Sequence, residues 1–319
     1  MKKTILIFIA VIFFILNFPI FGEGIRDMPV PSAYSETGSS VWKATKDGKT
    51  MYFGGSVHVL RNEDFPLPQE FEHAFYASEI IALETDVEKI ADPEVVEYIF
   101  SRVFLPGKTV LRDLLEPETY DLLAIYCMQN GFTIEQVAKI KPSMVVNMIV
   151  VQQMEKFGFA QEGVDMYFLV KAKEHDKQVY FLESVQSQID IIVTMGDGYE
   201  NEYVLYSLED LEDTEEEIES LVAEWKSGIS TRTEDALREM KDTWQNMYKS
   251  LITDRHNAWL PQIEKLFYSG KTCFVIVGLA HMYGPDGLLA ELEKSGYNIE
   301  KLTIPSLPAA SQTPLKVQR

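Results

Sequence analysis

Four short apolar runs, each followed within a few residues by a histidine or a glutamate, constrain the fold more than any other feature. These pairs are Thr50–Phe53 with His58, Ile80–Leu83 with Glu84, Gln178–Leu182 with Glu183, and Lys271–Val277 with His281. Runs of this length and composition are typical of buried strands. Because sites in open α/β sheets form at the carboxyl ends of strands, we expect the four polar side chains to meet at one edge of a single sheet.

Helical segments separate these strands, which predicts an α/β fold with a mixed central sheet and helices on both of its faces. A short amphipathic helix follows the first of these strands, and another helix begins at Gly163, before the third strand. Asp47-Gly48 lies between two runs rich in β-forming residues, which is a hairpin signal. We therefore expect a hairpin that leads directly to His58.

A helical insertion is predicted to interrupt the α/β core over about residues 92–160 and 187–268. Pro residues at helix starts and an Asn-Gly pair at one helix end mark several boundaries. The predicted helices include Pro117–Gln129, a short helix at Thr133–Ala138, Pro142–Lys156, and Glu234–Leu251 with apolar residues at 3-4 spacing. Pro261 is expected to bend or restart the helix that follows.

The two ends of the chain are predicted to lie outside the folded domain, which spans residues 41–305. A basic start, an apolar run and small residues at its exit predict a signal peptide over residues 1–24. The alternative is an uncleaved membrane anchor, and in either case the folded part lies outside the cytoplasm. Residues 25–40 are expected to be an exposed linker, and residues 306–319 a flexible tail.

The negative charge of the chain disfavours some classes of binding partner. The formal net charge is −20, and loss of Lys2 and Lys3 would make it −22 (−20 − 2). So acidic a protein repels phosphate backbones and anionic membranes, which argues against nucleic-acid binding. Contact with a membrane is expected only through an uncleaved N-terminal segment. Cys127 and Cys273 are interpreted as buried free thiols, although an oxidising compartment would allow them to pair.

Motifs along the chain resemble those of the TraB/GumN family, which includes Tiki-type membrane-linked metalloproteases and pheromone-shutdown proteins. The resembling segments, in chain order, are VWKATKDGKTMYFGGSVHVL, LETD, GVDMYF, FLES-Q, RHNAW and VGLAHMYGPDGLLAELEKSGY. They run from about Val41 to Leu302. Two Gly-x-x-His motifs, with LETD and FLES-Q between them, are far more specific than one such motif alone.

The paired histidines predict a metal centre. His58, His281 and Glu84 form the two-imidazole, one-carboxylate set that binds a catalytic divalent ion, with Mn, Co or Zn as candidates. A lone histidine after a strand is more often structural, but two in matched contexts favour ligands. Glu183 is expected to be a further ligand or the general base.

Three further segments supply candidate supporting residues. Arg255 is expected to pair with a site carboxylate or hold a substrate oxyanion, and an interhelical salt bridge is an equal alternative. Asp165 is expected to orient one of the histidines. The resemblance implies an Arg-Asn pair, but His256 separates Arg255 from Asn257. Either His256 is a third imidazole at the site, or Asn257 acts after a small shift.

These features favour a secreted or envelope metal-dependent hydrolase, most plausibly a peptidase acting on a peptide or protein substrate, as the resemblance implies. The resemblance also allows a non-catalytic protein that sequesters a peptide, or an accessory protein of polysaccharide export. The sequence contains neither HExxH nor Gly-x-Ser-x-Gly, which argues against a zincin protease and the usual serine-hydrolase elbow. The oligomeric state is not predicted.

Overall fold

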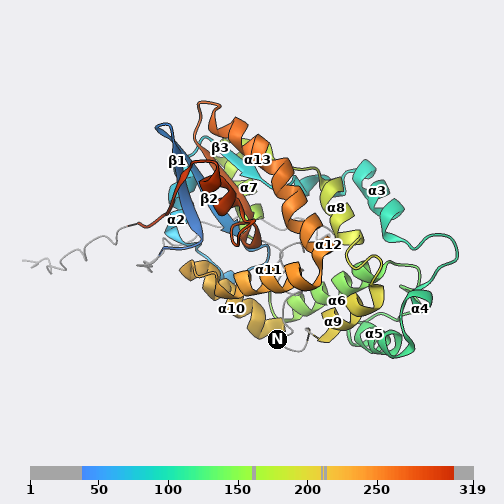
Figure 1. Cartoon of the computed structure of the whole chain (residues 1–319). Helices are drawn as coiled ribbons and strands as arrows, with labels where there is room; N and C mark the ends of the chain where they lie inside the picture. The colour runs from blue at the N-terminus through green and yellow to red at the C-terminus, as the bar shows by residue number, and fades with distance from the viewer. Residues whose placement is uncertain (1–37, 160–162, 210, 212–213, 305–319) are drawn as a thin grey trace, which may run out of the picture.

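A six-stranded mixed sheet lies at the centre of the fold (Figure 1). The computed structural model describes residues 38–159, 163–209, 211 and 214–304. The strand order is β4-β3-β5-β2-β1-β6. The strands are β1 (Val41–Lys46), β2 (Lys49–Ser56), β3 (Ile80–Leu83), β4 (Gln178–Phe181), β5 (Cys273–Gly278) and β6 (Asn298–Lys301). The predicted α/β fold with a mixed sheet is confirmed.

Four neighbouring strands, β4, β3, β5 and β2, run parallel, and this brings their carboxyl ends to one edge of the sheet. In the register, Ser56 of β2 pairs with Gly278 of β5, and Leu83 of β3 pairs with Ile276 of β5. Leu83 also pairs with Phe181 of β4. β1 and β6 complete the sheet with antiparallel pairings. The predicted hairpin joins β1 and β2, whereas β6 has no counterpart among the predicted strands.

Helices cover both faces of the sheet, as predicted. On one face, α13 (Asp254–Phe267) and α14 (Leu288–Lys294) pack their apolar residues against β1, β2, β3 and β5. On the other, α2 (Gln69–Tyr76), α7 (Val164–Glu174) and α10 (Thr214–Ser227) enclose a larger core. Because both faces are covered, the parallel strands are almost continuously apolar, as β5 illustrates.

The remaining helices gather mainly at the side of the molecule away from β1 and β6 (Figure 1). They are α3 (Pro93–Val103), α4 (Leu111–Leu114), α5 (Pro117–Gln129), α6 (Pro142–Lys156), α8 (Val185–Val193), α9 (Glu200–Glu209), α11 (Thr231–Thr243) and α12 (Gln245–Tyr248). The predicted bounds of α5 and α6 are confirmed. The short helix predicted at Thr133–Ala138 is wrong, because these residues form irregular structure and turns.

Two further expectations concern interruptions of the helices. The helix predicted over Glu234–Leu251 is broken at Trp244, whose backbone is not helical (φ −123°, ψ 57°) and whose ring lies 5.0 Å from that of Tyr199. Pro261 lies inside α13 without ending it. Pro261 and Asn257 are both exposed, so the carbonyl that loses its hydrogen bond is open to water.

The predicted terminal segments fall mostly outside the described residues. The signal peptide (1–24) and the tail (306–319) lie wholly outside, as does most of the linker (25–40). Ser39 and Ser40 are described, and both are fully buried, so the predicted exposure is wrong for them. Within the described ranges, no helix is both long and apolar enough to cross a bilayer. Cys127 and Cys273 are free and buried, as favoured by the sequence.

Candidate active site at the carboxyl edge of the sheet

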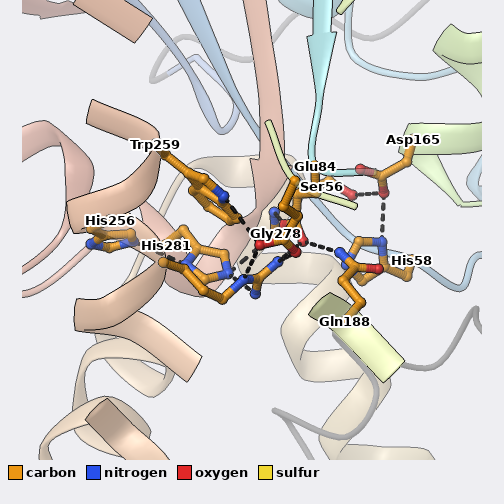
Figure 2. Close-up of polar contacts among 11 residues, drawn as sticks. Ser56, His58, Glu84, Asp165, Gln188, His256, Trp259, Gly278 and His281 are labelled. Carbon is orange, nitrogen blue, oxygen red and sulfur yellow. Dashed lines mark hydrogen bonds and ion pairs between the residues drawn. The ribbon is translucent and has the colours of Figure 1, made fainter. Parts of the chain in front are cut away.

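The parallel strands deliver the four predicted residues to one edge of the sheet. Glu84 follows β3 directly, and Glu183 lies two residues beyond β4. His281 ends a 3₁₀ turn, Leu279–His281, immediately after β5, and His58 lies two residues beyond β2. Figure 2 shows the polar contacts that connect this group to its neighbours. The sheet therefore creates a polar cluster between its two helical layers.

His58 is paired with Asp165, which lies at the start of α7. His58 Nδ1 is 2.6 Å from Asp165 Oδ2, and the hydroxyl of Ser56 donates to the same oxygen. The side chains of His58 and Asp165 are 11% and 17% exposed, so both are mostly buried but still in contact with solvent. Because the carboxylate accepts from Nδ1–H, the neutral imidazole carries its lone pair on Nε2.

Burial lowers the pKa of His58, but the charge and hydrogen bond of Asp165, together with the charge of Glu84, more than offset this effect. The net result is a raised pKa. Burial would raise the pKa of Asp165, yet the pairing with His58 and the Ser56 hydrogen bond bring it below its ordinary value. The two shifts agree, since each group favours the charged form of the other.

Glu84 is held by three donors. Its Oε2 accepts from Gln188 Nε2 at 2.9 Å and from Arg255 Nη2. Its Oε1 accepts from the backbone N–H of Gly278 at 2.5 Å and lies 3.8 Å from His281 Nε2. Glu84 thus connects the strand ends of β3 and β5 to helices α8 and α13.

Arg255, on α13, places its guanidinium at the centre of the cluster. Besides Glu84, it donates to both oxygens of Glu183, at 2.7 and 3.2 Å, and to Nε2 of His281 at 2.7 Å. Its Cζ lies 4.4 Å from the ring centre of Trp259, one helical turn further along α13. Burial would lower the pKa of Arg255, but Glu84 and Glu183 raise it, so the group stays charged.

A chain of hydrogen bonds that begins at Arg255 fixes the protons of His281 and His256. Since Arg255 donates to Nε2 of His281, the proton of His281 is on Nδ1 and is donated to Nε2 of His256 at 2.9 Å. His256 in turn donates from Nδ1 to the Asp286 carbonyl at 2.7 Å. Burial lowers the pKa of His256 to about 4 and places the pKa of His281 well below its ordinary value. Both rings are therefore neutral.

A recess of about 30 Å³ lies beside this cluster, lined by residues that include His58, Glu84, Asp165, Gln188 and Arg255. This exceeds the roughly 10–15 Å³ that one water molecule needs. A larger cleft of about 620 Å³ has Glu183 on its wall, and Thr85 lines both spaces. The recess is therefore a water-sized space next to a cleft large enough for part of a polymer substrate.

The predicted metal ligands do not form a cation site in this arrangement. Glu84 and His281 both face the guanidinium of Arg255, while His58 faces Asp165. Across the part of the chain that is described, no group of three or more His, Cys, Asp or Glu side chains is arranged to hold a metal ion. The side chains as they lie therefore do not fit the expected ion.

The other predicted residues differ in their placement. Asp165 contacts His58, and Arg255 pairs with site carboxylates, which is one of the three possibilities predicted for it. His256 is buried against His281, whereas Asn257 is exposed on the outer side of α13. The structure thus brings His256, and not Asn257, to the cluster.

Sequence reasoning missed four residues that support the cluster. These are Ser56, Gly163, Gln188 and Trp259, which contact Asp165, the His58 backbone, Glu84 and Glu183 respectively. Gln188 had a usable signal, because it is a polar residue among Val185, Ile189 and Ile192 on the buried face of α8. Such an interruption of an apolar stripe indicates a partner for the amide.

Gly163 supports His58 by close approach of the backbone. A Cβ placed on Gly163 would lie 2.3 Å from the carbonyl carbon of His58, and the N–H of Val164 donates to the Val57 carbonyl at 3.0 Å. We expect Gly163→Ala to displace His58, with about 1–3 kcal/mol of destabilisation and a disproportionate loss of any turnover. Denaturant unfolding and a peptide-cleavage assay check this.

The matched control for this substitution is Gly54→Ala in β2, the strand that leads to His58. There an added Cβ meets the rings of Phe274 and Phe71 and not His58. The control should destabilise the fold without the additional loss of turnover. Equal loss of turnover in both variants, at equal stability, would contradict the role assigned to Gly163.

Comparison with known proteins adds one positive finding. The sequence model of the TraB/PrgY/gumN family matches residues 40–301. This range contains every residue of the polar cluster described above. Neither the curated proteins nor the solved structures that were compared gave a match to the chain.

Proposed function

The chain belongs to the TraB/PrgY/gumN family, and from this membership and the geometry of the cluster we propose that it is a hydrolase acting on peptides. The observation that carries the proposal is the His58–Asp165 pair at the wall of a water-sized recess. A peptide fits the adjoining cleft and the acidic character of the protein better than a nucleic acid does. The reaction is proposed to occur outside the cytoplasm, on the basis of the N-terminal sequence alone.

His58 is proposed to act as the general base and then as the general acid. Its Nε2 takes a proton from a water in the recess as the water oxygen attacks the scissile carbonyl carbon. Asp165 holds the tautomer and stabilises the imidazolium that forms. The imidazolium then gives its proton to the leaving amine as the carbon–nitrogen bond breaks. The products are a carboxylate fragment and an amine fragment.

Arg255 is proposed to stabilise the negative charge that develops on the carbonyl oxygen. The described contacts use four of its five N–H donors, two from Nη2, one from Nε and one from Nη1. This leaves one N–H on Nη1, on a side chain that also lines the recess. A fixed, buried donor of this kind is well suited to an oxyanion because it needs little reorganisation.

The expected divalent ion stays a prediction and is given no step in this proposal. When bound, such an ion would polarise the carbonyl or lower the pKa of a water. Glu84 and His281 would have to leave Arg255 before they could bind an ion. For the same reason Glu183, which accepts from Arg255 and from Trp259 at 3.2 Å, is not proposed as the base.

Cleavage of a mixed peptide library by the purified chain, followed by mass spectrometry of the fragments, tests the proposed function. We expect defined cleavage products with the wild type and their loss with Asp165→Asn, which leaves His58 without its carboxylate. Tight retention of intact peptides without cleavage would favour the sequestering alternative. If the peptides are neither cleaved nor retained, the result would favour the polysaccharide-export alternative and contradict the proposal.

A further inference from the structure

The guanidinium of Arg255 occupies the place where the sequence predicts a metal ion. Glu84, Glu183 and His281 converge on it, and all four side chains are at most 10% exposed. We propose that Arg255, and not a divalent ion, is the cation that these three residues hold in this chain. The cluster is then a latent ion site that a side chain of the protein itself has filled.

The lone pair of His281 gives the first argument. A neutral imidazole has one acceptor nitrogen, and here Nδ1 carries the proton that His256 accepts. Nε2 is therefore the only acceptor of this ring, and Arg255 donates to it at 2.7 Å. A metal ion would need the same lone pair, so binding of an ion and this contact with Arg255 exclude each other.

The carboxylates give the second argument. Glu84 accepts from Gln188, Gly278 and Arg255, and Glu183 accepts from Arg255 and Trp259. Two buried carboxylates need a cation between them, since an uncompensated buried charge is strongly unfavourable. The guanidinium supplies that charge, and its planar fork matches carboxylate geometry.

Removal of the guanidinium should expose a competent ion site. Glu84, Glu183 and His281 are two carboxylates and one imidazole, a set that suits Zn²⁺, Mn²⁺ or Co²⁺. Gln188, Trp259 and His256 already hold these three side chains in place by hydrogen bonds. Ligands held in this way bind ions more tightly than loose ones.

The test measures bound metal and needs no substrate. Wild type, Arg255→Met and Arg255→Met with Glu84→Gln are dialysed against Zn²⁺, Mn²⁺ or Co²⁺, and the metal content of each is measured. We expect no stoichiometric ion in the wild type, about one per chain in Arg255→Met, and at least tenfold weaker binding in the double variant, which loses a ligand. Thermal unfolding should show stabilisation by the ion in Arg255→Met only.

Arg61→Met is the matched control. Arg61 also bridges two glutamates, Glu215 and Glu219, but these are about half exposed and have no histidine beside them in the described contacts. This variant should gain no ion. If Arg255→Met folds only when the ion is present, this dependence on the ion also supports the proposal, because it shows that the variant binds the ion.

One stoichiometric ion in the wild type, lost in His281→Ala, would overturn the proposal. So would an Arg255→Met variant that folds but binds no more ion than Arg61→Met. Because bound metal is measured without a substrate, either failure would leave the proposed peptide hydrolysis to be judged by its own assay.

Discussion

The substitution Arg255→Met is expected to lower the free energy of unfolding by about 3–5 kcal/mol, the range for breaking a buried ion pair by removing one partner. The guanidinium is 5% exposed and contacts Glu84, Glu183 and His281. Methionine fills much of the volume but leaves two buried carboxylates without their cation. Urea unfolding in metal-free buffer measures the change.

The second substitution Glu84→Gln should recover part of this loss. It removes one of the two uncompensated charges, so the double variant should be more stable than the sum of the single changes predicts, by about 0.5–3 kcal/mol. Arg61→Met, which breaks a more exposed pairing, should cost roughly 1 kcal/mol. Equal stability of Arg255→Met and the wild type would contradict the ion network described at the strand ends.

The substitution His58→Ala is expected to reduce kcat for peptide cleavage by about 10²–10⁴-fold, the range for loss of a general acid–base group. Asp165→Asn should reduce it as well, because the amide no longer holds the proton on Nδ1. The side chain of His58 is 11% exposed and packs at the edge of the core, so the fold should survive. Steady-state kinetics on a cleaved library peptide, with circular dichroism beside it, measure both effects.

His73→Ala is the control for this pair of variants. His73 is exposed on α2. The turnover and the stability of the His73→Ala variant should therefore match those of the wild type. If His58→Ala cleaves at the wild-type rate while remaining folded, the acid–base role is wrong. If it loses activity only together with its circular dichroism signal, His58 is structural.

The strand-end pattern was the most informative part of the sequence. Because β2, β3, β4 and β5 are parallel neighbours, residues that follow each strand had to emerge at one edge. His58, Glu84, Glu183 and His281 could therefore be placed near one another from period and topology alone. Sheet topology predicts where the backbone at each strand end lies, but it does not predict which group each side chain contacts.

The partners depend on helix packing, which local patterns do not specify. Asp165 reaches His58 because Gly163, the residue directly before α7, contacts the His58 backbone. Arg255 reaches both carboxylates because α13 crosses the sheet with its Arg255 and Trp259 face inward. Each of these contacts is separated by more than 70 residues in sequence. The contacts of Arg255 with Glu84, Glu183 and His281 are set by this helix packing and could not be predicted from the strand ends.

The missed β6 and the broken helix have the same origin. The strand Asn298–Lys301 is short and mostly polar, and it forms because β1 offers an open antiparallel edge. The break at Trp244 forms where its ring packs against Tyr199 and Tyr206. In both places tertiary contacts override the local pattern, as they commonly do for weak propensities.

Hydrolysis itself is tested most directly by the origin of the oxygen in the product. The wild type is incubated with the peptide library in water enriched in heavy oxygen, and the fragments are analysed by mass spectrometry. The account predicts that each new carboxyl terminus gains the mass of one heavy oxygen, and that His58→Ala forms these fragments at least about a hundredfold more slowly. Intact peptides after full incubation with folded wild type, or unlabelled new termini, would contradict it.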